Sequence, residues 1–369
     1  MEDLIRWRRE LHQIPEIGLQ EVKTAAYIRN ELEKMGYKWE SIVETGTAVF
    51  IDYGCKETIA FRSDIDALEI DEKNDIDFVS KHPHVMHACG HDGHMSALLG
   101  LAKKLKESKE TISHNILLIF QPAEESPGAA KFVVESGVFD KYHVKAIFGM
   151  HLMPMYDEGV VVCKSGPLMA MCGELDVKIR GKGSHAGLPQ DGKDSIIIAT
   201  HVLEQYQTLV SRRISPFEPV VINIGKIRGG TARNSVASET VLNGTIRCYS
   251  EQMFQKINGN LQSIHKGIEY MYNCDIEWSC PPMYPPVIND KNLYEFFKQN
   301  VDCSYQELDE PLMLAEDFSF YQRKIPGLFF FLGIKTEQYQ SGLHTETFNF
   351  NEDVLQKAVN LYYRLALNY

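Results

Sequence analysis

Four short segments of this sequence concentrate side chains that bind metal ions or transfer protons. The densest holds three His, one Cys and one Asp within nine residues, more than a polar helix start requires. Each segment stands where an expected strand ends, and sites in open α/β sheets form at the carboxyl ends of strands. The segments are Arg62-Ser63-Asp64-Ile65-Asp66, Met86-His87-Ala88-Cys89-Gly90-His91-Asp92-Gly93-His94, Phe120-Gln121-Pro122-Ala123-Glu124-Glu125 and Gly149-Met150-His151-Leu152, with Gly342-Leu343-His344-Thr345 as a distant counterpart of the last.

The first two segments offer carboxylates, a thiol and imidazoles at spacings that suit a metal ion. Asp64 and Asp66 face the same side of an extended segment, although in isolation a solvated acidic loop is the simpler interpretation. Cys89 and His91 stand at i and i+2 before a helix, so they can reach one ion or bridge two. The alternative is a polar helix start in which Asp92 binds the exposed amides.

The other segments add two carboxylates and two histidines. Glu124 and Glu125 are adjacent, and adjacent carboxylates repel each other unless a cation or a shared proton compensates. This favours separate roles for the two residues, in which one Glu binds metal and the other transfers protons. The alternative interpretation is that both lie in a solvent-exposed turn. His151 and His344 are candidate metal ligands only in combination with the other segments, because a lone His is more often a structural residue than a ligand.

The combined donor set predicts a catalytic metal centre. One Cys, three His and several carboxylates suit Zn²⁺, Mn²⁺, Co²⁺ or Ni²⁺ better than Mg²⁺ or Ca²⁺. No paired C-x-x-C motif points to a structural zinc site, and the donors are spread along the whole chain.

The elements that must position these donors alternate between strand-like and helix-like patterns. Such alternation predicts an α/β domain with a largely parallel sheet. Helices are expected within 4–36, on either side of Pro15, and at 90–105, 129–136, 293–299 and 352–367. Strands are expected at 47–53, 58–61, 115–120, 146–150 and 328–332.

The middle of the chain has a different pattern, with two helices against four alternating strands. Strands at 174–181, 220–227, 239–247 and 275–278 and helices at 195–210 and 253–272 fit a ferredoxin-like β-α-β-β-α-β unit. The Pro-rich stretch 280–286 is expected to be its exit linker, because Pro-Pro pairs do not continue a strand. We therefore predict a catalytic domain of residues 1–172 and 286–369, interrupted by an inserted α+β domain of residues 173–285.

The composition of the protein bears on which classes of partner it can bind. The 369 residues carry 38 basic and 50 acidic side chains, a net charge of −12, which argues against nucleic acid or an anionic membrane as a partner. No apolar stretch is long enough for a membrane span, and no apolar run follows the basic N-terminal residues as in a signal peptide. The eight scattered cysteines are interpreted as reduced thiols, so we expect a cytoplasmic protein.

As a set, these motifs resemble the aminoacylase/carboxypeptidase-like metallopeptidase family. The resemblance is specifically to its amidohydrolase branch of hippurate hydrolases, N-acetyl-diaminopimelate deacetylases and auxin-conjugate hydrolases, and it covers essentially the whole chain. Besides the segments above, the resemblance rests on Arg8-Arg9-Glu10-Leu11-His12-Gln13-Ile14-Pro15-Glu16, Gly181-Lys182-Gly183-Ser184-His185-Ala186-Gly187-Leu188-Pro189, Asn234-Ser235-Val236, Gly244-Thr245-Ile246-Arg247 and Ala315-Glu316-Asp317-Phe318-Ser319.

The resemblance implies a role for each candidate residue. Glu124 is similar to the general base of the family, Asp66 to its metal-orienting acid and His185 to its oxyanion-stabilising histidine. Asn234 and Arg247 are similar to residues that hold the substrate carboxylate. The implied ligands of two divalent metal ions are Cys89, His91, Glu125, His151 and His344.

The function implied by the resemblance is hydrolysis of the amide bond of an N-acyl amino acid, N-acetyl in the leading interpretation. The inserted domain is expected to be a lid that also carries the interface of a homodimer. One alternative is a metallo-dipeptidase or aminopeptidase of the same fold. The Cys89-Gly90-His91-Asp92 motif argues against it, and so does Asp64, because dinuclear peptidase relatives carry a ligand histidine at that position. The other is a catalytically silent binding protein, which retention of all the implied ligands disfavours.

Overall fold

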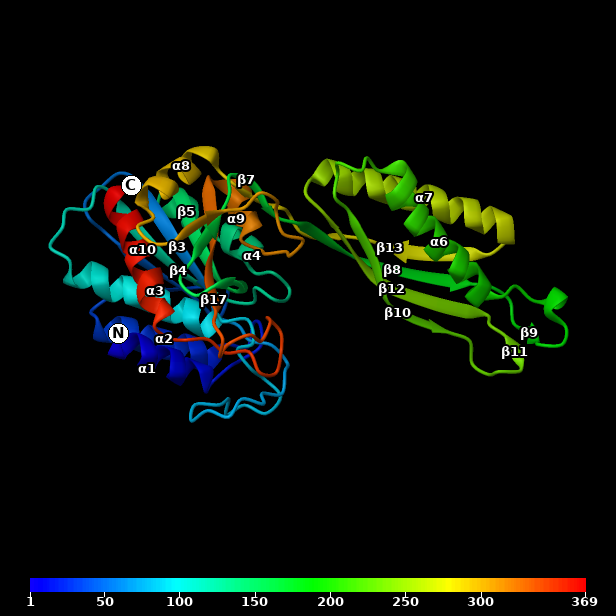
Figure 1. Ribbon diagram of the computed structural model, residues 1–369, viewed down its shortest axis with the longest axis horizontal. Helices are drawn as coiled ribbons and strands as arrows, with labels where there is room; N and C mark the ends of the chain where they lie inside the picture. The colour runs from blue at the N-terminus through cyan, green and yellow to red at the C-terminus, as the bar shows by residue number, and fades with distance from the viewer. The chain divides into compact units, whose positions relative to one another are not determined.

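The protein folds into two compact units, seen in a computed structural model that describes residues 1–369 (Figure 1). The first comprises Met1–Leu168, Val287–Pro311 and Asp317–Tyr369, and the second comprises Met169–Pro286 and Leu312–Glu316. The second unit thus begins at Met169 rather than at residue 173, and it includes a segment that the sequence assigns to the first. The physical reason is that the Ala170 amide donates to the carbonyls of Leu312 and Leu314, at 3.1 and 2.8 Å.

The first unit is built on a mixed eight-stranded sheet with a parallel centre. Strands β4, β3, β5 and β17 run parallel to one another, which confirms the predicted largely parallel sheet. Strands β1 and β2 extend one edge in antiparallel register, while β6 is antiparallel to β17 and parallel to β16. The order is β1 (Glu40–Ile42), β2 (Gly46–Ile51), β4 (Asn115–Gln121), β3 (Thr58–Asp64), β5 (Val144–Asp157), β17 (Gly327–Lys335), β6 (Val161–Cys163) and β16 (Tyr305–Glu307).

Helices cover both faces of this sheet, so its central strands are almost continuously apolar. Successive side chains of a strand point to opposite faces: on β17, Phe330 contacts Phe297 of α8, whereas Phe329 contacts Phe318 next to α9. The helices are α1 (Glu2–His12), α2 (Val22–Lys34), α3 (His91–Glu107), α4 (Ala130–Glu135), α5 (Val138–Lys141), α8 (Lys291–Asn300), α9 (Ser319–Lys324) and α10 (Val354–Asn368).

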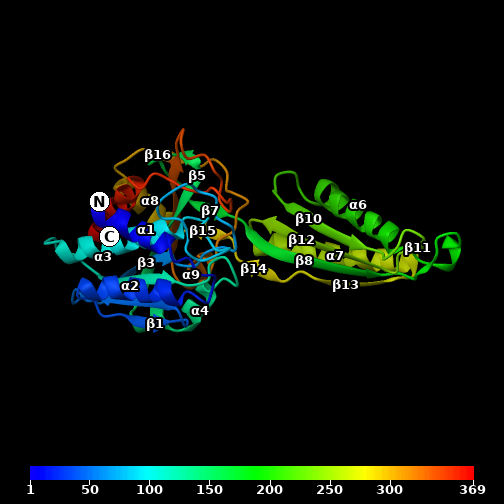
Figure 2. The same ribbon diagram turned by 90° about the horizontal axis from the view of Figure 1, so that it is seen from below.

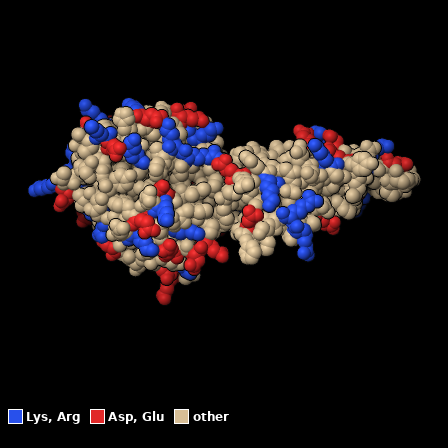
Figure 3. Space-filling model, turned by 90° about the horizontal axis from the view of Figure 1, so that it is seen from above, with Lys and Arg blue, Asp and Glu red and all other residues tan.

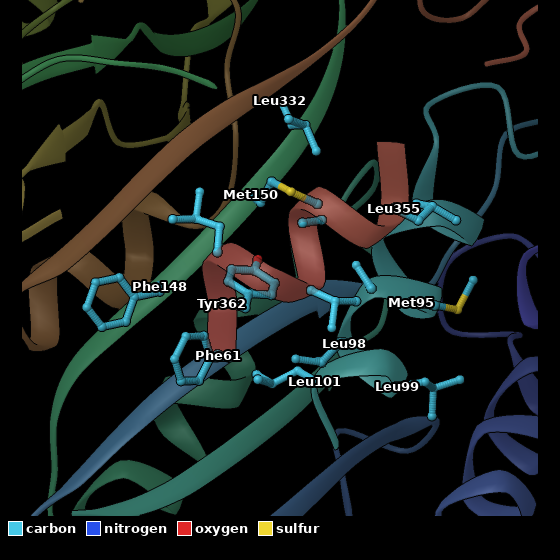
Figure 4. Close-up of a cluster of buried hydrophobic side chains, with 14 of the residues drawn as sticks. Phe61, Met95, Leu98, Leu99, Leu101, Phe148, Met150, Leu332, Leu355 and Tyr362 are labelled. Carbon is cyan, nitrogen blue, oxygen red and sulfur yellow. The ribbon is translucent and has the colours of Figure 1, made fainter. Parts of the chain in front are cut away.

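The core of the first unit lies between the sheet and helices α3 and α10 (Figure 4). Phe61 of β3 lies 5.4 Å from the ring of Phe148 on β5 and 5.2 Å from the ring of Tyr362 on α10. Leu98 and Leu101 of α3 belong to the same cluster and are fully buried. This packing holds α3 against the strands, and α3 begins with one of the candidate metal ligands.

The second unit is an antiparallel sheet with two helices on one face (Figure 2). Its elements follow the β-α-β-β-α-β order, and the sheet order β10-β12-β8-β13 places the first and third of these strands in the middle. From Glu174 to Arg180 of β8, polar residues alternate with residues such as Val177 that are buried against the helices. The elements are β8 (Met171–Arg180), α6 (Ser195–Arg213), β10 (Val221–Gly229), β12 (Glu239–Cys248), α7 (Glu251–Tyr272) and β13 (Asp275–Ser279).

The Pro-rich stretch corrects one expectation from the sequence. It contains a further strand, β14 (Pro282–Tyr284), which pairs with the beginning of β8, whereas a linker without strand structure was expected. A proline is tolerated there because β14 lies at the edge of the sheet, where a missing amide donor breaks no ladder.

Two further features concern the surface and the helices. No helix combines the length and the apolar character that a membrane crossing requires. On the face of the molecule drawn in Figure 3, basic and acidic side chains are interspersed over each unit.

Candidate metal centre

The candidate donors of the first unit meet where the parallel strands end. Asp64 is the last residue of β3, and Glu124 and Glu125 follow β4 by a few residues. His151 lies within the long strand β5, and His91 is the first residue of α3. Because β3, β4 and β5 are parallel, their carboxyl ends share one edge of the sheet, which is where such sites form.

One group of donors consists of Cys89, His91 and His151, whose donor atoms lie within 4.8 Å of one another. All three side chains are buried, and Cys89 Sγ is 3.3 Å from His151 Nε2. His151 Nδ1 lies 2.7 Å from the Leu152 carbonyl, so Nδ1 carries the proton and donates it there. The Nε2 lone pair of His151 therefore faces the thiol, as a metal-ligating imidazole requires.

A second group consists of Cys89, Glu125 and His344, so the two groups share the thiol. His344 Nε2 is 3.1 Å from Glu125 Oε1. The His344 amide donates to the Ala88 carbonyl at 2.9 Å, which ties this distant residue to the segment of Cys89. His344 adopts φ +59°, a left-handed conformation that is uncommon for a residue with a Cβ and that often marks a functional position.

Two buried atoms of these groups lack a hydrogen bond, namely His91 Nε2 and, apart from its 3.1 Å contact with His344 Nε2, Glu125 Oε1. Buried polar atoms are normally satisfied, so both atoms fit a cation as their missing partner. Burial raises the pKa of the Cys89 thiol well above its usual range, and Glu125 and Glu124 raise it further. A bound cation reverses this effect, because it deprotonates a coordinating thiol.

In the absence of a metal cation, His91 and His151 of the first group differ in protonation state. Burial opposes protonation of His91, but Asp64 and Asp66 outweigh it and raise its pKa to about 10. The pKa of His151 is lowered well below its usual range, mainly by burial and also by its histidine neighbours. His151 is therefore neutral, which is the form that binds metals. A metal that binds His91 must displace a proton. The structure brings the metal-type donors named from the sequence together, and the set fits a divalent cation.

Asp66 contacts members of both groups. Its Oδ2 accepts the Glu125 amide at 3.0 Å, and its backbone carbonyl lies 2.9 Å from His91 Nδ1. These bonds orient the imidazole of His91 and the chain at Glu125. Asp66 Oδ1 is also 3.3 Å from His91 Nδ1, so the carboxylate itself contacts both residues, as an orienting carboxylate does.

Asp64 is occupied by a different set of partners. Its Oδ1 is 2.7 Å from His94 Nδ1, and its Oδ2 accepts from Arg62 Nη1 at 2.8 Å. His94 Nε2 in turn accepts the Leu152 amide at 2.9 Å, so both ring nitrogens of His94 are used within the protein. Nearby His91, His94 and Arg62 lower the pKa of Asp64 well below its usual range, although burial opposes this.

The motifs in the sequence assign no functional role to Arg62 or His94. A signal for His94 was present, because His91 and His94 are three residues apart on a helix and so share a face. Arg62 carried no comparable signal, since its partner Asp317 lies 255 residues away, with Nη2 2.8 Å from Asp317 Oδ1.

Glu124 is buried beside the donor groups. It is 6% exposed and forms a close group with His91 and Glu125. The Asp317 amide donates to its Oε1 at 3.4 Å. The preceding Ala123 adopts φ +48°, so the chain turns sharply just before the two carboxylates. This turn directs both carboxylates toward the donor groups.

The remaining candidate residues lie in the second unit. The short strands β9 (Ser184–His185) and β11 (Ser235–Val236) pair with each other, and the Ala186 amide donates to the Asn234 carbonyl at 3.1 Å. His185 and Asn234 are therefore neighbours, at the end of the unit where β9 and β11 are drawn in Figure 1. Arg247 pairs with Cys172 near the beginning of β8, at the opposite end of the sheet.

Comparisons of the sequence identify related hydrolases. The chain is 38% identical over 375 residues to the IAA-amino acid hydrolase ILR1-like 4 of Arabidopsis thaliana, covering 98% of this chain and 84% of the plant protein. It is 37% identical over 377 residues to an uncharacterized hydrolase of Staphylococcus haemolyticus, covering 100% of this chain and 98% of that protein.

Comparison of the fold gives the same relationship. The chain resembles the crystal structure of the Bacillus subtilis YXEP protein, described as a dinuclear metal binding peptidase from the M20 family. The TM-score is 0.85 and the identity 31%, over 99% of this chain and 96% of that one. Residues 60–368 match the family described as peptidase family M20/M25/M40, which confirms the resemblance inferred from the motifs. The chain belongs to this family and is a hydrolase.

Proposed function

We propose that this protein is a metal-dependent amidohydrolase that cleaves the amide bond of an N-acyl amino acid, N-acetyl in the leading case. The observation that carries the proposal is the thiol of Cys89, which belongs to two groups of donors at once. Such sharing suits two ions in one site, with Glu124 beside them as a separate carboxylate. The plant relative named as an IAA-amino acid hydrolase supports an amino acid conjugate as the substrate class.

The proposed ligands are Cys89, His91, Glu125, His151 and His344, and Zn²⁺, Mn²⁺, Co²⁺ and Ni²⁺ all suit this set. Bound divalent ions supply Lewis-acid activation of water and of the scissile carbonyl. Asp66 holds His91 and the chain at Glu125 in place through the bonds described above.

Glu124 is the proposed general base. Its carboxylate accepts the proton of the attacking water and passes it to the leaving amine, a role that contributes about 10²- to 10⁴-fold to rate in comparable enzymes. The Asp317 amide orients Oε1 of Glu124.

The second unit is proposed to be a lid and dimerisation domain. Strand β12 begins at Glu239, three residues after β11 ends at Val236, and Arg247 lies eight residues further along the same strand, roughly 26 Å at the usual rise per residue. His185 and Arg247 of one chain therefore cannot contact the same small substrate. This separation supports a homodimer in which each active site takes His185 and Asn234 from one chain and Arg247 from the other.

The edge of the second unit offers a surface for such a dimer. Strand β10 pairs only with β12, so its other side presents free backbone donors and acceptors. Ile227 on β10 is 54% exposed, and Ile196 and Ile197 on the helix α6 are also exposed. A second copy can extend the sheet and cover these apolar side chains.

A metallo-dipeptidase or aminopeptidase of the same fold is the second candidate, and the description of the Bacillus subtilis relative supports it. The contacts of Asp64 favour the amidohydrolase, because Arg62 and His94 occupy its carboxylate.

A panel of N-acyl amino acids and dipeptides tests the proposal. We expect release of free amino acid from N-acyl substrates at rates that vary with acyl length and side chain, and little hydrolysis of dipeptides with a free amine. Faster hydrolysis of the dipeptides would favour the peptidase. No hydrolysis of either class by the metal-loaded protein would favour a binding protein.

Cys89→Ser and Glu125→Gln are expected to lose bound metal and turnover together, because each removes an anionic ligand. Metal content by atomic emission and turnover of the best panel substrate are the measurements. Cys163→Ser is the matched control, since Cys163 is also a buried cysteine but lies among apolar residues of the core and belongs to no donor group. A Cys89→Ser protein with full metal content and full turnover would refute the ligand assignment.

Glu124→Gln is expected to retain its metal but to lose about 10²- to 10⁴-fold in turnover, because an amide cannot accept the proton of water. The same two measurements check this. Metal loss in this variant, with normal metal in Glu125→Gln, would exchange the two assignments.

His185→Ala is expected to lower turnover by about 10²- to 10³-fold, as loss of an oxyanion donor does, while metal content and fold stay unchanged. Mixing His185→Ala with Glu124→Gln should restore activity, because an exchanged dimer contains one site with both residues intact. Differently tagged chains report whether subunits exchange. If exchange occurs without recovery of activity, His185 acts within its own chain.

A further inference from the structure

The motif Arg8-Arg9-Glu10-Leu11-His12 on α1 has no role in the chemistry described so far, yet its polar side chains Arg8 and His12 are buried along with Leu11. Arg8 is 1% exposed and connects segments that lie far apart in the sequence. Its Nε donates to Asp92 Oδ2 at 3.0 Å, 84 residues away, and its Nη2 donates to Asn349 Oδ1 at 2.6 Å, 341 residues away. The guanidinium thereby joins α1, the beginning of α3 and the segment that follows His344.

Aromatic rings fix the plane of this guanidinium. Arg8 Cζ lies 4.7 Å from the ring centre of Phe78 and 4.5 Å from that of Phe350. Cation–π contacts with desolvated arginine are favourable, and a planar fork needs a defined orientation to bind two acceptors. A lysine at this position keeps the charge but cannot form both bonds.

His12 reinforces the same junction from the next turn of α1. Its Nδ1 is 2.8 Å from Asp92 Oδ2, and its Nε2 is 3.0 Å from Glu72 Oε1. Both nitrogens therefore face carboxylates. Bonds to Asp92 and Glu72 raise the pKa of His12, although burial opposes this. Two cations, Arg8 and His12, thus hold one carboxylate, Asp92.

This junction lies close in sequence to two proposed metal ligands, because Asp92 is one residue from His91 and Asn349 is five residues from His344. Asp92 directly follows His91, and its Oδ1 accepts the Gly93 amide at 2.9 Å. The segment of Asn349 packs on the same turn, since a Cβ on Gly93 would lie only 2.7 Å from the ring of Phe350. The bond from the His344 amide to the Ala88 carbonyl closes the connection between the two ligand segments.

We propose that Arg8 and His12 are positioning residues that hold the ligand segments of His91 and His344 at the separation needed to bind metal. The inference rests on the proposed metal assignment of those two residues. It assigns to the N-terminal motif a part in metal affinity rather than in substrate contact. Partners of metal ligands elsewhere change affinity or activity by about 10- to 100-fold.

The test is the dissociation constant for Zn²⁺, measured on the full chain without substrate by competition with a chromogenic chelator. Arg8→Lys is expected to bind Zn²⁺ about 10- to 100-fold more weakly than the unchanged protein. Arg9→Lys is the matched control, because Arg9 pairs with Glu352 as Arg8 does but is half exposed and contacts neither Asp92 nor Asn349. Its Zn²⁺ affinity should stay within about twofold of the unchanged protein, as expected for an exposed ion pair.

Asn349→Ala provides a second variant in case Arg8→Lys does not fold, because it removes only one of the hydrogen-bond acceptors of the Arg8 guanidinium. Weaker Zn²⁺ binding by a folded Asn349→Ala protein supports the proposal. A lowered melting temperature with an unchanged Zn²⁺ dissociation constant, in either variant, overturns it and leaves these residues a purely structural role. Failure of the unchanged protein to bind Zn²⁺ would instead contradict the metal centre itself, so the two failures are distinguishable.

Discussion

The structure depends on holding several carboxylates and a thiol together in a buried space where they repel one another. Burial alone raises the pKa of Cys89, and Glu124 and Glu125 raise it further. Groups of this kind remain together only if cations compensate them. In addition, His91 Nε2 has no hydrogen-bond partner, and Glu125 Oε1 has only its contact with His344. A bound divalent ion satisfies both needs at once, which explains why the donors converge although the chain must hold them against repulsion.

Buried cationic side chains supply the rest of the compensation. Arg62 lies between Asp64 and Asp317, and Arg8 lies beside Asp92. Removing one partner of a buried ion pair leaves an uncompensated charge, which is strongly unfavourable. These pairs therefore fix the strands and the helix α3 in one arrangement. That arrangement places the carboxyl ends of the parallel strands around the donor groups, as in other open α/β sheets.

The second unit contributes through its length and its edges rather than through buried charge. Its strand β12 separates His185 from Arg247 by more than a small substrate can span, and its edge strand β10 lacks a partner. The two features have a common origin in the β-α-β-β-α-β topology, which leaves the second strand of the motif at an edge and both ends of the sheet exposed. Under the proposed dimer, the same topology supplies the interface and completes the active site.

The identities of the donors and their order along the chain were determined by the sequence, because Cys89, His91 and the Glu124-Glu125 pair follow or begin elements with strong local patterns. The β-α-β-β-α-β order was readable for the same reason, since apolar alternation is local. What the sequence could not determine is which donors share a group, whether Pro282 joins a strand, and how Arg8 reaches Asn349. Those contacts join residues up to 341 positions apart, and only the packing of α1, α3 and the sheet brings them within bonding distance.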